Sequence, residues 1–244
     1  MNLPQPLQQA FVIKRLNRFA ARIDIGGKIA LAHVPNSGRL GELIFPGAEV
    51  YAHPVDAAHR RTTHDLVLAR HKRVLVSVDS RAPNHIAAEA LQAGGVSPLG
   101  PVDELRTEVA LADRRIDLWA RVNGEEWLIE TKGCSLVRGK TAIFPDAPTI
   151  RGRHHVEALT NVVKQGGRAM VLFVIQRSDA REFRPNSATD PELCEALLRA
   201  RDAGVVVAAY RCRVSQRAIK LTDSVPVHLD GPLPDHLLED GPCA

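Results

Sequence analysis

Aromatic residues, patterned cysteines and long apolar runs are all scarce in this sequence. Phe, Trp and Tyr make up 4% of the 244 residues, so a core drawn from the 45% hydrophobic fraction must be mainly aliphatic. No apolar run approaches the roughly 20 residues of a membrane span, and the first residues carry no apolar signal core. These absences argue against a membrane protein and favour a globular chain.

The four cysteines lie far apart in the chain, and none forms the C-x-x-C spacing of a zinc or redox site. They are Cys134, Cys194, Cys212 and Cys243. We interpret them as reduced thiols, which indicates a reducing compartment. Together with the missing signal core, this predicts a cytoplasmic protein.

Net charge is small but unevenly distributed. The formal charge is +4 and the isoelectric point is about 9.0, which alone does not identify a nucleic-acid partner. Residues 1–80, however, hold eleven Lys and Arg against six Asp and Glu. The positive charge excess of the N-terminal third is therefore larger than that of the whole chain. Its surface is suited to a polyanion.

The first 80 residues have the pattern of short strands joined by turns. Residues 20–25 and 28–33 flank Gly26-Gly27, a good two-residue hairpin turn. Further strands are expected at 48–53, 66–69 and 74–78. This pattern predicts a small antiparallel barrel over residues 1–80, with an irregular sheet packed on the next domain as the alternative.

From residue 81 the pattern changes to mixed α/β. Helices are expected at 85–93, with Asn84 as its cap, at 152–165 and at 190–202. Strands are expected at 105–111, 115–122, 126–132, 169–176 and 205–210, separated after residue 132 by a long irregular stretch. The run 169–176 is apolar throughout, which predicts burial on both faces. This order occurs in restriction-endonuclease-like cores; we place that domain at 81–225 and a tail at 226–244.

Asn123-Gly124 is the strongest short hairpin signal in the chain. As the centre of a type I′ turn, it pairs Arg121 with Glu126 and puts Asp117 directly opposite Glu130. Directly paired residues share a face, and Lys132, two residues beyond Glu130, lies on that face as well. The sequence therefore predicts two facing carboxylates with a lysine beside them.

Two opposed carboxylates repel each other, and a divalent cation would compensate that repulsion. Mg²⁺ takes one or two carboxylates and keeps waters or phosphate oxygens. A lysine nearby can hold a phosphate or orient an attacking water, which is the equipment for phosphodiester hydrolysis. The alternative is a solvated strand face on which Lys132 merely neutralises Glu130.

Several segments resemble the sugar fermentation stimulation protein A family of bacteria and archaea. They are VIKRLNRF at 12–19, AHVPNSGRL at 32–40, RRIDLW at 114–119, IETKGCSL at 129–136, FPDAPTIRGRHHVEAL at 144–159, VLFVIQR at 171–177 and VSQRAIKL at 214–221. The resemblance implies an N-terminal OB-like β-barrel followed by a PD-(D/E)XK nuclease-like α/β domain. It also implies DNA binding and a link to regulation of sugar (maltose) metabolism.

By position, the resemblance assigns roles to five residues of the second domain. Asp117 matches the first metal-binding acid, Glu130 and Lys132 match the E-x-K pair, and Glu89 matches an additional metal-binding acid; Gln176 matches a polar active-site residue. Mg²⁺ or Mn²⁺ would be the cofactor. The chain departs from the family pattern at Gly133, where Asn is expected, and at Val34 and Ser37, where Cys and Thr are common.

DNA is the expected partner, and its contacts are expected from basic residues of the barrel and of one helix start. Lys14, Arg15 and Arg18 form a cluster, Arg39 follows a turn, and Arg151 lies where a helix N-terminus suits phosphate. His154 and His155 beside it are adjacent and make no zinc pair. Because the barrel is poor in aromatics, contacts with the phosphate backbone are favoured over base readout. For each residue a solvated basic face is the alternative.

Three functions compete at this point. The first is a metal-dependent nuclease, and the second is a non-specific DNA-binding regulatory protein without nuclease activity. The third is a small-molecule or nucleotide phosphohydrolase. Intact Asp117, Glu130 and Lys132 favour the first, whereas the family description favours the second. The absence of a recognisable helix-turn-helix or zinc motif argues against a conventional repressor.

Overall fold

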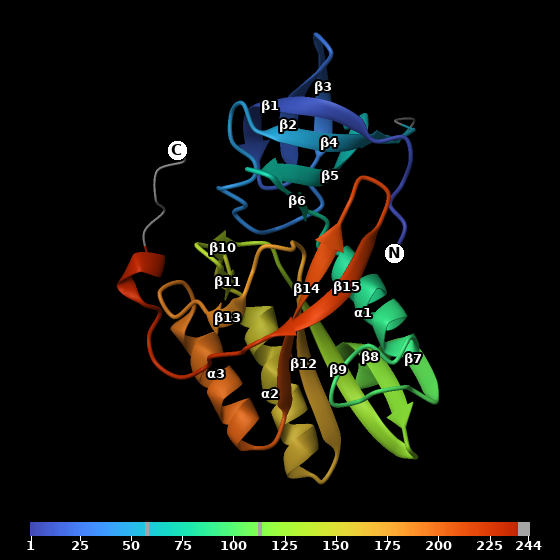
Figure 1. Cartoon of the computed structure of the whole chain (residues 1–244), viewed down its shortest axis with the longest axis vertical. Coiled ribbons are helices and arrows are strands. Elements are labelled where there is room, and N and C mark those ends of the chain that lie inside the picture. Colours follow the sequence, from blue (N-terminus) through green and yellow to red (C-terminus); the bar gives the residue numbers. More distant parts are fainter. Residues whose placement is uncertain (57–58, 112–113, 239–244) are drawn as a thin grey trace.

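A computed structural model describes residues 1–56, 59–111 and 114–238, which form two packed units (Figure 1). The first is a barrel, and the second is a mixed sheet covered by helices. The predicted barrel and mixed α/β domain are thus confirmed. Among the described residues, no helix combines the length and apolarity needed to cross a bilayer.

The barrel forms because alternate residues of each strand point to one aliphatic core. Its strands are β1 (Gln8–Asn17), β2 (Ala20–Ile25), β3 (Lys28–His33), β4 (Glu49–Pro54), β5 (His64–His71) and β6 (Val74–Ser77). They lie in the order β3-β2-β1-β4-β5-β6, and a pairing of β3 with β5 closes the barrel. Val12, Ile23 and Val50 are among the buried residues. The predicted hairpin at Gly26-Gly27 is confirmed, with positive φ at both glycines.

The second unit is built on a six-stranded sheet in the order β15-β14-β12-β9-β8-β7. The strands are β7 (Glu104–Leu111), β8 (Arg114–Val122), β9 (Glu125–Cys134), β12 (Arg168–Ile175), β14 (Val206–Val214) and β15 (Ile219–Val225). Helix α1 (Ala82–Gln92) covers one face, and α2 (Ile150–Lys164) and α3 (Pro191–Asp202) cover the other (Figure 1). Successive residues of β12 alternate between the two cores, which confirms the strand predicted to be buried on both faces.

The stretch 133–150, expected to be irregular, contains two short strands. β10 (Val137–Arg138) and β11 (Thr141–Phe144) join β13 (Glu182–Pro185) in a small separate sheet. Both strands are short, and β11 pairs in parallel with the distant β13, which explains why no local pattern revealed them.

Both ends of the described chain pack against the second unit. Leu3 is buried with α1 and donates its backbone N–H to the Arg217 carbonyl at 2.8 Å. At the other end, Leu229, Leu233 and Leu237 are buried, so residues 226–238 are not the loose tail expected from their composition. Residues 239–244 of the expected tail lie outside the described residues. Both segments are held by partners remote in sequence, which local composition does not reveal.

Candidate functional site

The hairpin of β8 and β9 has the predicted register. Its ladder pairs Arg121 with Glu126 and continues in step to Leu118 opposite Ile129. Asn123 and Gly124 both have positive φ, as a type I′ turn requires. The last ladder pair is Leu118–Ile129, one step before the expected opposition of Asp117 and Glu130.

Asp117 differs from the prediction in its neighbours. Its Oδ2 accepts hydrogen bonds from the backbone N–H and the hydroxyl of Thr131, both at 2.9 Å. Its Oδ1 accepts one from Asn84 Nδ2 at 2.8 Å. Asp117 therefore turns toward α1, and no hydrogen bond or ion pair joins it to Glu130 within the described chain. The β8–β9 ladder ends before Asp117, so Asp117 and Glu130 do not share a face as their pairing would have required.

Asn84 reaches Asp117 because α1 begins earlier than predicted. The helix starts at Ala82 with Pro83 in its first turn, and Arg81 is its N-cap residue. The prediction that Asn84 caps this helix is therefore wrong. Its side chain is instead free to point at Asp117 and Thr131.

Glu130 and Lys132 lie on one face of β9, as predicted. Lys132 Nζ lies 2.5 Å from Glu130 Oε1, and His155 Nδ1 of α2 contacts the same oxygen. The Glu130 side chain is only 3% exposed. Burial alone would raise the pKa of Glu130, but the hydrogen bonds from His155 and Lys132 hold that pKa below its ordinary value. The carboxylate is therefore ionised, and His155 donates from Nδ1.

One atom of this cluster is unsatisfied. Glu130 Oε2 is buried and has no hydrogen-bond partner. An orphaned carboxylate oxygen is costly in a protein interior, and a cation would satisfy it. The described residues contain no group of three His, Cys, Asp or Glu arranged to hold a metal. A site with one or two carboxylates still suits Mg²⁺, whose remaining ligands are waters or phosphate, so Glu130 fits this ion.

Two residues assigned by resemblance have other contacts. Glu89 is exposed and forms an ion pair with the Met1 amino group, which also donates to the Ile219 carbonyl of β15. Gln176 is buried, and its Nε2 donates to Ser77 Oγ and to the Asp79 carbonyl, each at 2.9 Å. Gln176 thus ties the end of β12 to the barrel and its linker, while Glu89 is not brought to the Asp117 cluster.

Gly133 is explained by close packing beside Gln176. A Cβ at this position would stand 2.7 Å from Pro83 Cγ and 2.8 Å from Gln176 Oε1. No side chain fits there without movement of its neighbours. The glycine thus allows α1, β9 and β12 to approach at the end of the E-x-K strand.

The basic residues of the barrel have two different environments. The Arg15 guanidinium donates to the carbonyls of Arg39, Gly38 and Arg18, the last two at 2.9 and 3.1 Å. Burial is the main cause that lowers the pKa of Arg15. Arg15 thus has a structural role, because it holds together the backbone at Arg18 and at Arg39. The exposed side chains of Lys14, Arg18, Arg39 and Arg151 have no carboxylate partner in the described residues.

The barrel turn that carries Arg39 is held against the segment preceding α2. Asp146 Oδ2 accepts from the backbone N–H of Leu40 at 3.1 Å. A Cβ on Gly38 would lie 2.6 Å from the same carboxylate oxygen, so only glycine permits this approach. The contact joins the basic turn of the barrel to the loop that leads into Arg151.

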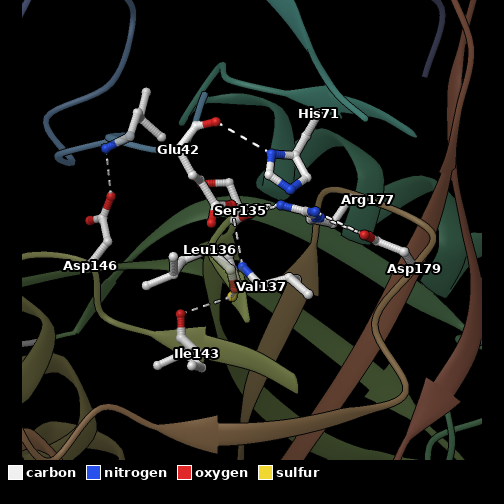
Figure 2. A network of polar contacts seen from close by, with 11 residues as sticks. Glu42, His71, Ser135, Leu136, Val137, Ile143, Asp146, Arg177 and Asp179 are labelled. Atoms are coloured by element: carbon white, nitrogen blue, oxygen red, sulfur yellow. Dashed lines mark hydrogen bonds and ion pairs between the residues drawn. The ribbon is translucent and has the colours of Figure 1, made fainter. Parts of the chain in front are cut away.

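Arg177 links the two units from a buried position (Figure 2). Its side chain is 1% exposed, and it donates to both oxygens of Asp179 at 2.7 and 2.8 Å. It also donates to Glu42 of the barrel at 2.6 Å and to the Ser135 carbonyl at 3.0 Å. Since Ser135 directly follows β9, this network fixes the E-x-K strand relative to the barrel.

The sequence offered a signal for only some of these residues. His155 precedes Leu159 by four positions, so the predicted apolar stripe of the helix already turned it toward the sheet. The sequence singles out Asn84, but as a helix cap and not as a partner of Asp117. Arg177 follows an apolar strand without any pattern that predicts its burial.

Comparison with known proteins gives consistent matches over nearly the whole chain. Residues 13–78 match the family described as "SfsA N-terminal OB domain", and residues 81–218 match "Sugar fermentation stimulation protein RE domain". The "Sugar fermentation stimulation protein homolog" of Desulforamulus reducens is 40% identical over 227 residues, which cover 93% of this chain and 94% of the relative. That of Acetivibrio thermocellus is 41% identical over 230 residues, covering 93% and 99%.

A solved structure is similar as well. "The structure of Pyrococcus Furiosus SfsA in complex with Ca2+" matches with a TM-score of 0.83 and 26% identity. The match covers 93% of this chain and 98% of that chain. The barrel and the mixed α/β unit therefore occur together, in this arrangement, in a second protein.

Proposed function

The chain belongs to the sugar fermentation stimulation protein family, and from this premise we propose that it is a divalent-cation-dependent nuclease that binds DNA and hydrolyses phosphodiester bonds. One observation carries the proposal: the ionised, buried Glu130 has one oxygen shared by Lys132 and His155 and the other without a partner. A buried anion with a free oxygen beside a lysine is suited to a cation and a phosphate.

Each residue of the cluster has a distinct part in this proposal. Glu130 and Asp117 would hold the cation, Mg²⁺ or Mn²⁺, which when bound polarises phosphate and lowers the pKa of water. Lys132 would leave its contact with Glu130 and bind a phosphate oxygen instead. His155 would keep Glu130 oriented, whereas Asp117 would exchange its contacts with Asn84 and Thr131 for the cation. Lys14, Arg18, Arg39 and Arg151 would contact the phosphate backbone, and Arg15 would hold the chain in place at Arg18 and Arg39.

The related Pyrococcus furiosus structure supports the choice of cofactor class. That structure is described as a complex with Ca²⁺, a cation that takes oxygen ligands as Mg²⁺ does. We extend to this chain only the preference for a divalent cation with oxygen ligands.

A second candidate is a non-specific DNA-binding protein that regulates sugar (maltose) metabolism without cleaving DNA. A specific observation favours it: both oxygens of Asp117 are already engaged by Thr131 and Asn84, and Lys132 is engaged by Glu130. Binding a cation at both acids would require these contacts to rearrange. The name of the curated relatives also agrees with this role.

The test is to incubate purified protein with single- and double-stranded DNA and RNA in the presence of Mg²⁺ or Mn²⁺. We expect cleavage that EDTA abolishes and that Lys132→Ala and Glu130→Gln each abolish. Arg181→Gln, a change of an exposed residue in the same unit, serves as the control. DNA binding without cleavage of any polymer would favour the second candidate. Hydrolysis of nucleotides or small phosphate esters alone would identify a phosphohydrolase.

A further inference from the structure

Asp117 lies where two strands of the sheet turn over together. Leu118 of β8 packs on the α1 side and Ile116 on the α2 side, although residues two apart in a strand normally share a face. Leu105 and Leu111 of β7 pack on opposite sides in the same way. Since Leu118 and Ile116 are both fully buried, the backbone between them is fixed, and only the side chain of Asp117 is left to turn.

The residue of β7 that lies opposite Asp117 bears the strain of this turnover. It is Glu108, and the ladder pairs on either side of the two residues are Thr107–Leu118 and Val109–Ile116. Glu108 has a φ of 54°, and no other non-glycine residue inside a described strand has a positive φ. Backbone strain of this kind concentrates at functional sites. Strain opposite the acid therefore indicates that the placement of Asp117 serves a function.

The Asp117 side chain is held by the first turn of α1. Its Oδ1 accepts from Asn84 Nδ2 at 2.8 Å, and its Oδ2 accepts from the backbone N–H of Thr131 at 2.9 Å. The Asn84 side-chain oxygen in turn contacts the Thr131 hydroxyl. Glu130, with its unpartnered oxygen, instead faces α2. A cation bound by both acids therefore requires Asp117 to leave these contacts, which we call the Asn84 latch.

The start of α1 is tied to the barrel as well. Ser80, four residues before Asn84, donates its backbone N–H and its hydroxyl to the Pro35 carbonyl, at 3.0 and 2.8 Å. Asn36 Nδ2 donates to the Val78 carbonyl at 3.0 Å. Pro35 and Asn36 begin the basic turn of the barrel. A displacement of that turn therefore reaches Asn84 through one short stretch of chain.

We propose that the Asn84 latch couples the barrel to the cation site. Nucleic acid bound at the basic turn moves the start of α1, releases Asp117 from Asn84 and lets its carboxylate turn toward Glu130. The cation site is then complete only while the barrel holds nucleic acid. The inference deepens the proposed function, on which it rests for the nucleic-acid partner and for a cation at the two acids.

A static interface would use the same contacts. Gln176 ties the linker at Asp79 to β12, and Asp146 ties the basic turn to the segment before α2, so both bonds resist movement. The two arrangements differ in one measurable property. A static interface keeps the Thr131 N–H bonded to Asp117 when nucleic acid binds, whereas an opened latch leaves this N–H without its acceptor.

The experiment measures hydrogen exchange of the Thr131 amide by NMR, in EDTA, with and without a saturating DNA duplex. Because an amide exchanges through its local opening, we expect the duplex to speed this exchange about tenfold or more. Ser80→Gly removes the hydroxyl that binds Pro35 and loosens the linker, so it should abolish most of the acceleration. Ser178→Gly changes an exposed loop serine of the same unit and should leave the acceleration intact.

Cation affinity gives a second measurement, without nucleic acid. Asn84→Ala opens the latch permanently, so Mn²⁺ should bind about tenfold more tightly in calorimetry, because a hydrogen bond to a charged group no longer has to be broken. Thr131→Val removes only the hydroxyl and should change the affinity in the same direction. Thermal melting verifies that the variants are folded.

Two outcomes would overturn the coupling alone. They are unchanged Thr131 exchange in a protein that binds and cleaves the duplex, and weaker Mn²⁺ binding by folded Asn84→Ala, which would make Asn84 a support for the cation-bound acid. Absence of duplex binding, or of Mn²⁺ binding in every variant, contradicts the coupling together with the proposed function. Faster Thr131 exchange in a protein that never cleaves supports the coupling and contradicts only the hydrolytic function.

Discussion

His155 of α2 donates from Nδ1 to the oxygen of Glu130 that Lys132 also contacts, and both His155 and Glu130 are nearly excluded from solvent. Groups that orient a metal-binding side chain typically change metal affinity by 10- to 100-fold. We therefore expect His155→Ala to weaken Mn²⁺ binding, measured by calorimetry without nucleic acid, about tenfold or more. His154→Ala changes the adjacent histidine and should leave the affinity unchanged. Equal affinity of a folded His155→Ala variant would remove His155 from this positioning role.

Gly133 should not tolerate a side chain. Gly133→Ala places a Cβ against Pro83 and Gln176, and overpacking of this kind costs about 1–3 kcal/mol. Gly41→Ala is the matched control, because a Cβ there meets nothing within 4 Å and the backbone is not in the left-handed region. Urea unfolding of the two variants measures the difference. If both are equally stable, the packing at Gly133 is not as tight as the contacts indicate.

Removal of Arg177 should destabilise the protein strongly. Arg177→Met leaves Glu42 and Asp179 without their buried cation, and breaking a buried pair in this way costs about 3–5 kcal/mol. Adding Glu42→Gln and Asp179→Asn should recover part of the loss, since no unpaired charge is then left. The free energy of unfolding of the single and triple variants gives the comparison, with exposed Arg181→Gln as the control. A loss under about 0.5 kcal/mol, typical of a surface change, would contradict this role.

Acid should weaken the same network through Asp179. Burial opposes ionisation there, but hydrogen bonds from Arg177 hold the pKa of Asp179 below its ordinary value of 3.8. A carboxyl whose folded-state pKa is lowered contributes stability above its unfolded pKa, and this contribution is lost as pH falls through the folded-state pKa. The free energy of unfolding should therefore fall less steeply below about pH 4 in Asp179→Asn than in the unaltered protein. Parallel pH profiles would show that Asp179 does not contribute.

Arg15 and Arg18 should respond differently to substitution. Arg15→Gln removes the donors to four backbone carbonyls and should lower the free energy of unfolding by about 1–3 kcal/mol. Arg18→Gln should leave stability unchanged but reduce the salt dependence of DNA binding, as expected for a phosphate contact. Salt titrations of DNA affinity, with urea unfolding of both variants, separate the two roles. An unchanged salt slope in Arg18→Gln would take Arg18 out of the interface.

Much of the fold was predictable because local chemistry specifies it. The Asn123-Gly124 turn accommodates positive φ at both positions, so the register to Leu118 and Ile129 could be counted from it. The apolar run of β12 predicted a strand between two layers. Gly26-Gly27 likewise predicted the first barrel hairpin.

The arrangement at the end of the sheet was not predictable in the same way. Whether Asn84 or Glu89 of α1 meets Asp117 depends on where the helix begins and how it lies on the sheet. The regular alternation of side chains along β8 could not reveal that the β8–β9 ladder stops before Asp117. The burial of Arg177 depends on Glu42, 135 positions away in the chain.

The sequence by itself determined the two units, the hairpin register and the shared face of Glu130 and Lys132, because turns and strand periodicity act between near neighbours. Only the tertiary structure decided that Asp117 turns to Thr131, that His155 meets Glu130, and that Phe11 stands outside the barrel. These positions result from the packing of α1, α2 and the barrel around the sheet. Such packing joins residues whose separation along the chain carries no local signal.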